Sequence, residues 1–221
     1  MVAICVAPFF VLLPLSKFCD IIEKFGEKMQ NIKISKSLTA KAYDQNDVIF
    51  DNKNVTDDLL CVLKKEPATQ ENFQLADTQE YIANLNSAIY IDKLKVKIFV
   101  LYSNLTPVSF AIFEQKTSPT FCLKFVWTSI DYAKLGFASI LLRASVANLI
   151  ECGAKKIVAE VLQSDKIADN LLESFSKIEE INTQKTEKFD KKEKVQKNVF
   201  EFDVSKLDDK QLLQDIVKMA I

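Results

Sequence analysis

The chain has 221 residues, which is enough for one ordinary domain with a hydrophobic core. Apolar residues make up 48% and charged residues 27% of it, values that are typical of a globular protein and exclude a disordered chain. The net charge of −1 gives no argument for a nucleic-acid partner, and the lack of histidine excludes imidazole bases and histidine metal ligands, so we expect no metal.

Residues 2–15 are almost wholly apolar and contain Pro8 and Pro14. This run is shorter than the roughly 20 residues of a membrane span. No lysine or arginine precedes it, and no clear cleavage site follows, as a signal peptide would require. Three interpretations stay open: a mis-assigned start, with a native beginning at Met29; a membrane or export signal; or a native helix packed on the domain. We therefore divide the chain into an N-terminal extension, residues 1–28, and a domain, residues 29–221.

The first half of the domain reads as one strand, two helices and three strands. Alternating apolar residues predict a strand over 32–38. A helix is expected over 56–65, with Thr56 as N-cap and Pro67 beyond its end. A second helix is expected over 78–85. Three strands are then predicted at 88–91, 96–102 and 108–114, joined by turns and leading into a fourth strand.

That fourth strand, residues 121–130, opens the most informative part of the chain. A turn at 131–139 and a helix at 140–150 follow, and Gly153 ends the helix. Next come a strand at 156–161 and a helix at 164–175. Because a helix connects the two strands, we expect them to be parallel. The Gly-x-Ala turn before the first helix leaves backbone N–H groups unpaired, which is typical of a phosphate site.

The C-terminal part is expected to form a hairpin from residues 178–189 and 198–204. The lysines and acidic residues at its tip indicate a solvated turn more than a binding patch. Residues 207–219 predict an amphipathic helix. This helix either packs on the core, which the pattern favours, or mediates a homodimer.

From about residue 96 to residue 204 the chain resembles the GCN5-related N-acetyltransferase (GNAT) family. Gly136-Phe137-Ala138 fits the second half of that family's loop motif, (Gln/Arg)-x-x-Gly-x-(Gly/Ala). Asp165-x-x-Ala168-x-x-Leu171 stands where the family has Asn-x-x-Ala-x-x-Leu-Tyr. The chain departs from the family at Ala133 (usually Gln or Arg), Asp165 (usually Asn) and Leu172 (usually Tyr). The resemblance implies an α/β (α+β) fold: a mixed sheet of six to seven strands flanked by helices, here with an extra C-terminal helix.

The resemblance also implies an N-acetyltransferase that uses acetyl-CoA, or another acyl-CoA, as co-substrate and acts on a small-molecule or protein amine. Glu114, near the expected cleft, and Tyr132, beside the loop, are the weak candidates for a catalytic acid or base. The pattern favours a surface carboxylate at Glu114, and Tyr132 could take the place of the missing tyrosine. The departures favour an alternative, a non-catalytic interaction or regulatory module. The residues expected to bind the cofactor are Thr128, Lys134, Leu135, Gly136, Phe137, Ala138, Ser139 and Asp165.

The five cysteines form no Cys-x-x-Cys pair, so a zinc or redox motif is not expected. Cys61, Cys122 and Cys152 lie in apolar patterns and read as buried free thiols. Free thiols favour a cytoplasmic protein. The alternative, a membrane-associated or exported protein, depends on residues 2–15 alone.

Overall fold

A computed structural model describes residues 2–6, 9–13, 31–35, 37–64, 73–191 and 194–219. The chain divides into two compact units, Met1–Gln30 and Asn31–Ile221. In the first unit, β1 (Val2–Val6) and β2 (Phe9–Leu13) pair as an antiparallel hairpin. The interpretation of this segment as a native helix is therefore wrong for these ten residues, which form strands. Residues 14–28 lie outside the described residues.

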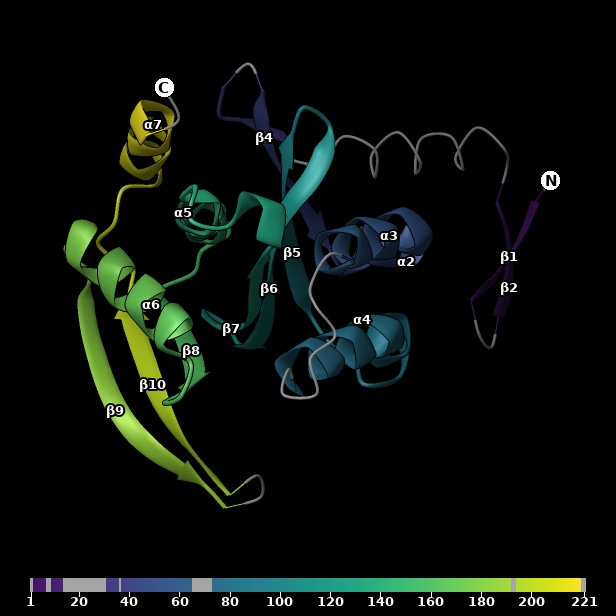
Figure 1. Ribbon diagram of the computed structural model, residues 1–221. Helices are drawn as coiled ribbons and strands as arrows, with labels where there is room; N and C mark the ends of the chain where they lie inside the picture. Colours follow the sequence, from purple (N-terminus) through teal and green to yellow (C-terminus); the bar gives the residue numbers. More distant parts are fainter. Residues whose placement is uncertain are drawn as a thin grey trace. The chain divides into compact units, whose positions relative to one another are not determined.

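The second unit is built on one mixed sheet of eight strands, in the order β3-β4-β5-β6-β7-β8-β10-β9 (Figure 1). Only β7 and β8 pair in parallel, and the other pairs are antiparallel. The expected mixed sheet is thus confirmed, with the three-residue β3 added at one edge. The strands are β3 (Asn31–Lys33), β4 (Leu38–Asp44), β5 (Val96–Ser103), β6 (Thr106–Thr117), β7 (Thr120–Thr128), β8 (Lys156–Leu162), β9 (Asn182–Asp190) and β10 (Val195–Asp203).

Helices cover both faces of this sheet and enclose two apolar clusters. Alternate residues of a strand point to opposite faces. Phe99 and Leu101 of β5 therefore join the cluster under α5, α6 and α7, while Ile98 and Val100 join the one under α2, α3 and α4. The helices are α2 (Gln45–Phe50), α3 (Asn52–Leu63), α4 (Phe73–Ile91), α5 (Phe137–Glu151), α6 (Lys166–Ile178) and α7 (Asp209–Met219), with a short 3₁₀ turn at Ile130–Tyr132.

Helix α5 is the central helix of the first cluster. Every residue from Ile140 to Leu149 is buried, because the sheet covers one side of the helix and α6 and α7 contact others. A helix that is apolar all round requires such cover. The predicted C-terminal helix supplies part of it: α7 packs on α5, and Leu212 is buried in the same cluster. Core packing is thus the role of α7 that the structure supports.

The N-terminal half of the domain differs from the sequence prediction in several places, one of which is the additional helix α2. The strand expected over 32–38 is interrupted by a turn, in which the Ser35 hydroxyl accepts a hydrogen bond from the Leu38 amide at 3.2 Å, and β4 begins only there. Thr56 is not an N-cap but lies inside α3. The strand expected over 88–91 is wrong, because those residues complete α4.

Helical spacing explains this last correction. The buried residues Leu75, Ile82, Leu85 and Ile89 follow one another at intervals of seven, three and four, so residue 89 continues the apolar face of α4.

Cysteine burial is also only partly as expected. Cys122 is buried and Cys61 half-buried, but Cys152 is exposed at the C-terminal end of α5.

Candidate functional site

The two parallel strands at the centre of the sheet separate along their length. Thr120–Leu123 of β7 pair with Lys156–Ala159 of β8, and no further pair joins the two strands. Each strand keeps its other neighbour: Thr128 stays opposite Ser109 of β6, and Leu162 stays opposite Lys197 of β10. We call residues 124–128 and 160–162 the strand divergence. It opens towards the carboxyl ends of both strands, the edge at which ligands bind in open α/β sheets.

A β-bulge begins the strand divergence. In the β6–β7 ladder Ile112 faces Phe125 and Phe113 faces Leu123, which leaves Lys124 as an extra residue on β7. A bulge shifts the alternation of side chains and increases the local twist. Leu123 therefore packs under α5, whereas Phe125 packs in the cluster on the α3 and α4 face.

The loop after β7 leads directly into the N-terminus of α5. Gly136 is the N-cap, with φ of 80° in the left-handed region, and no side chain caps the helix. Its carbonyl accepts the first helical bond, from the amide of Ile140 at 3.0 Å. The amides of Phe137, Ala138 and Ser139 precede that bond and have no partner within the helix. With no acidic residue in the first turn, the helix dipole there is free to attract an anion.

The N-terminus of α6, after β8, is closed by comparison. The carboxylate of Asp165 accepts from the amide of Ala168 at 3.0 Å, and its carbonyl accepts from the amide of Asp169 at 3.1 Å. The amide of Lys166 donates to the carbonyl of Ser164 at 3.1 Å. Of these two helices, α5 therefore offers an anion the more accessible backbone donors. Asp165, expected to bind the cofactor, serves as the N-cap of α6.

The other expected cofactor residues lie between the end of β7 and the first turn of α5. The hydroxyl of Thr128 lies 2.9 Å from that of Ser109. Lys134 is exposed and has a positive φ of 65°, and Leu135 beside it is 60% exposed. A Cβ added to Gly136 would meet no atom within 4 Å apart from those of the adjoining residues. This loop is open to a ligand, and the cofactor role of these residues stays a prediction.

The two catalytic candidates lie at opposite ends of the strand divergence. Glu114 is not at the end of its strand, because β6 continues to Thr117, and it pairs with Cys122 near the closed end. Cys122 is six residues from Thr128, or about 20 Å along β7. Tyr132 belongs to the loop at the open end, where its ring stacks on Phe137 with 5.9 Å between centroids.

Glu114 is held by two residues that the sequence did not single out. The hydroxyl of Tyr81, from α4, donates a hydrogen bond to it at 2.8 Å, and the ammonium of Lys124 lies 3.8 Å away. Burial, together with the charge and hydrogen bond of Glu114, raises the pKa of Tyr81 far above its usual value, so the phenol remains a donor. The Glu114 side chain is only 14% exposed. This cluster lies on the sheet face of α4, opposite α5.

The part of the chain that the structure describes holds neither a metal centre nor a membrane-spanning helix. There, no group of three or more cysteine, aspartate or glutamate residues has a metal-binding arrangement. No helix among the described residues has the length and apolar character needed to cross a membrane.

The sequence matches no family model and no curated protein. The structure, however, is similar to those of several acetyltransferases. The ribosomal-protein-S18-alanine N-acetyltransferase of Escherichia coli aligns with a TM-score of 0.51 at 15% identity, over 77% of this chain and 96% of that one. The PaiA N-acetyltransferase of Thermoplasma acidophilum, solved with coenzyme A, aligns with a TM-score of 0.53 at 9% identity, over 76% and 99%.

A third similar structure, from Desulfovibrio desulfuricans, is assigned to the GNAT family of acetyltransferases. It aligns with a TM-score of 0.53 at 12% identity, over 75% of this chain and 99% of that one. Each of these three proteins is covered almost completely, so the similarity extends over the whole of their fold. The order of the strands, the single parallel pair and the helix after the Gly136 turn all agree with it. This chain therefore has the fold of the GCN5-related N-acetyltransferases, at a low level of sequence identity.

Proposed function

We propose that the protein is an acyl-CoA-dependent N-acyltransferase, with acetyl-CoA as the expected co-substrate and a small-molecule or protein amine as acceptor. One observation carries the proposal: the strand divergence opens at the same sheet edge as the uncapped N-terminus of α5. An anionic group and an extended arm attached to it would find backbone donors at both places.

Each part of the site has a role in this proposal. The amides of Phe137, Ala138 and Ser139 would hold the pyrophosphate, and Lys134 would add a positive charge beside it. From the bulge at Lys124 to Thr128, β7 lacks a partner on its β8 side. Backbone groups of that segment are available to bind the pantetheine arm, and one N–H could stabilise the oxyanion that forms when the amine attacks the thioester carbonyl.

Glu114 is the acid–base candidate with the better position. Residues 124–128 extend over about 16 Å, so a thioester reaching inward from the loop would approach the closed end, where Glu114 lies. The amine must lose a proton in the reaction. Glu114 would accept that proton directly or through a water molecule, with Tyr81 fixing the orientation of the carboxylate. Tyr132 would instead border the open end, near the phosphates.

The similar structures support the reaction class but not the acceptor. The Escherichia coli protein modifies an alanine of a ribosomal protein, and the Thermoplasma acidophilum protein binds coenzyme A. The cleft-side residues of this chain carry no signature of such acceptors. The described cysteines Cys61, Cys122 and Cys152 are free, which supports a reducing compartment such as the cytoplasm.

A second function, a non-catalytic module built on the same fold, is favoured by Leu172. This residue stands where the family has the tyrosine that protonates the leaving thiolate. The aliphatic side chain of leucine has no proton to donate. Leu172 is also 2% exposed and belongs to the apolar core. Water would have to protonate the thiolate in its place.

Calorimetric titration of the full chain with acetyl-CoA, followed by transfer assays on a panel of amines, tests both functions. The proposal expects micromolar binding and release of free coenzyme A in the presence of an acceptor. Binding without turnover on any amine would favour the non-catalytic module. A folded protein that does not bind acetyl-CoA at millimolar concentration would refute the enzyme.

A further inference from the structure

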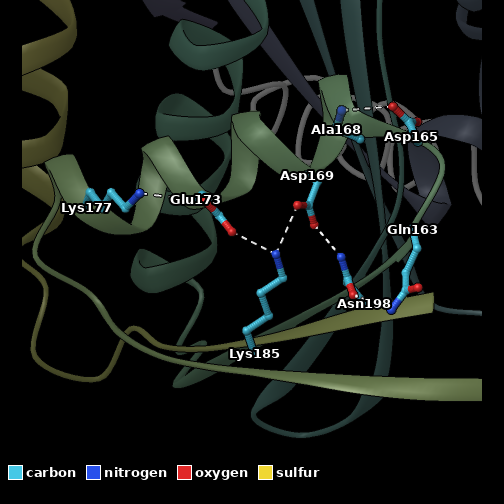
Figure 2. A network of polar contacts seen from close by, with 8 residues as sticks. All are labelled: Gln163, Asp165, Ala168, Asp169, Glu173, Lys177, Lys185 and Asn198. Carbon is cyan, nitrogen blue, oxygen red and sulfur yellow. Dashed lines mark hydrogen bonds and ion pairs between the residues drawn. The ribbon is translucent and has the colours of Figure 1, made fainter. Parts of the chain in front are cut away.

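A chain of polar side chains ties the end of β8 to β10, α6 and β9 (Figure 2). The side-chain amide of Gln163 donates to the side-chain oxygen of Asn198 at 3.2 Å. The side-chain amide of Asn198 donates in turn to the carboxylate of Asp169 at 2.7 Å. The second carboxylate oxygen of Asp169 accepts from the ammonium of Lys185 at 2.9 Å. We call Gln163, Asn198, Asp169 and Lys185 the polar chain.

The two central members of the polar chain are buried in an otherwise apolar region. Asn198 is 5% and Asp169 8% exposed. Burial alone would raise the pKa of Asp169, but the hydrogen bonds from Lys185 and Asn198 outweigh it and hold the pKa below its ordinary value. Lys185 also donates to Glu173 at 2.7 Å and lies 4.9 Å from the ring centre of Phe200. The geometry of this buried cluster is therefore strongly constrained.

The polar chain lies beside the segment of β8 that borders the strand divergence. Asn198 lies directly opposite Val161, in the half of β8 that no longer pairs with β7. The backbone of Gln163 also contacts β10, because its backbone N–H donates to the carbonyl of Gln196 at 3.0 Å. Residues 160–162 of β8 lie between β7 and β10. The backbone pairs and the hydrogen bonds of Gln163 join this segment to β10.

We infer that the polar chain is a positioning device that holds residues 160–162 of β8 on β10 and so keeps the strand divergence open for the pantetheine arm. None of its members needs to touch the cofactor. The inference deepens the proposed function and depends on it for the identity of the ligand. The structural effect on β8, however, can be measured without any ligand.

The first measurement is hydrogen exchange on the full-length chain, with Asn198→Ala as the main variant. We expect faster exchange in peptides covering residues 160–170, with β5 and β6 unchanged, because the variant loses both bonds of Asn198. The matched control is Lys156→Met. It removes the ion pair of Lys156 with Glu201, which joins the same two strands near the closed end. Exchange at 160–170 should not change in this control.

The second measurement is the dissociation constant for acetyl-CoA in the same proteins. Loss of a supporting contact that shifts the wall of a site should weaken binding about tenfold in Asn198→Ala and leave Lys156→Met within about twofold of wild type. If Asn198→Ala does not fold, the more exposed variants Gln163→Ala and Lys185→Met take its place.

The outcomes separate this inference from the proposed function. Unchanged exchange at 160–170 in the folded variant would overturn the positioning role, whatever the chain binds. Faster exchange with unchanged affinity would overturn the link to the cleft. Failure of the wild-type chain to bind acetyl-CoA would instead refute the proposed function, and the exchange result would still decide what holds β8.

Discussion

Two glycines flank α5, and they allow a test of the proposed phosphate site within a single helix. Gly136 precedes the helix with φ of +80°, and Gly153 follows it with φ of +89°. At both positions an added Cβ would meet no atom within 4 Å apart from those of the adjoining residues. Alanine at either position therefore leaves the surrounding packing unchanged, and the substitution lowers the free energy of unfolding only through the left-handed backbone conformation.

The two substitutions should cost the same stability and differ in binding. A left-handed conformation costs an L-residue about 1–2 kcal/mol, so Gly136→Ala and Gly153→Ala should each lower the free energy of unfolding by that amount. For a chain of this length, each kcal/mol corresponds to roughly 2–4 °C in Tm. Only at Gly136 does the new methyl group enter the open space beside the first-turn amides of α5. There it should weaken acetyl-CoA binding at least about tenfold, or about 1.4 kcal/mol.

Urea denaturation and calorimetric titration of the three proteins are the assays. The reasoning predicts equal losses of stability, together with a loss of affinity in Gly136→Ala alone. Wild-type affinity in a folded Gly136→Ala variant would place the anion elsewhere. An equal loss of affinity in Gly153→Ala would show that the effect comes from the stability of α5 and not from contact with the ligand.

Three further predictions concern side chains. Glu114→Gln should lower kcat about 100-fold, with KM for acetyl-CoA unchanged, because the base acts on the amine; steady-state kinetics showing wild-type kcat would remove Glu114 from the mechanism. Arg143→Met should lower the free energy of unfolding by about 3–5 kcal/mol, since the Arg143 side chain is 1% exposed and its loss leaves the Glu179 carboxylate, whose side chain is 9% exposed, without its ion pair; a loss below about 1 kcal/mol in urea denaturation would contradict this. The folded pKa of Asp169 lies below its ordinary value of 3.8, so its carboxylate stabilises the fold above that pH and the contribution is lost as pH falls through the folded pKa. The stability advantage of wild type over Asp169→Asn should therefore shrink as the pH falls below about 4 in acid titrations, and an advantage that does not decrease with falling pH would refute the assignment.

The parts of the fold that sequence reasoning predicted well are those that local patterns determine. The strands β5 to β8 and the helix α5 have clear periodicity and are bounded by turns or by glycine. Their order was sufficient to expect a parallel pair at β7 and β8, since a crossover helix joins them. Helix α2 was missed although its signal was present: Asp44 and Asp47 form a reciprocal capping box at its start.

The interior of the site could not be read in this way, because it depends on contacts between distant segments. Tyr81 and Glu114 are 33 residues apart, and their hydrogen bond requires α4 to lie over β6. The bulge at Lys124 is a property of the β6–β7 register and has no marker in the residues around it. The sequence predicts the end of this strand at Glu114, whereas β6 continues through the exposed residues 116–117.

The proposed cofactor contacts would tolerate large changes in sequence. The donors at the N-terminus of α5 and along residues 124–128 of β7 are backbone groups, which most substitutions preserve. Replacement of the family's glutamine or arginine by Ala133, and of its tyrosine by Leu172, removes side chains and leaves those donors in place. Such changes should therefore alter the rate of transfer more than the affinity for the cofactor. The affinity of Gly136→Ala for acetyl-CoA tests the binding site. The turnover of Glu114→Gln, compared with wild type, distinguishes an enzyme from a module that only binds.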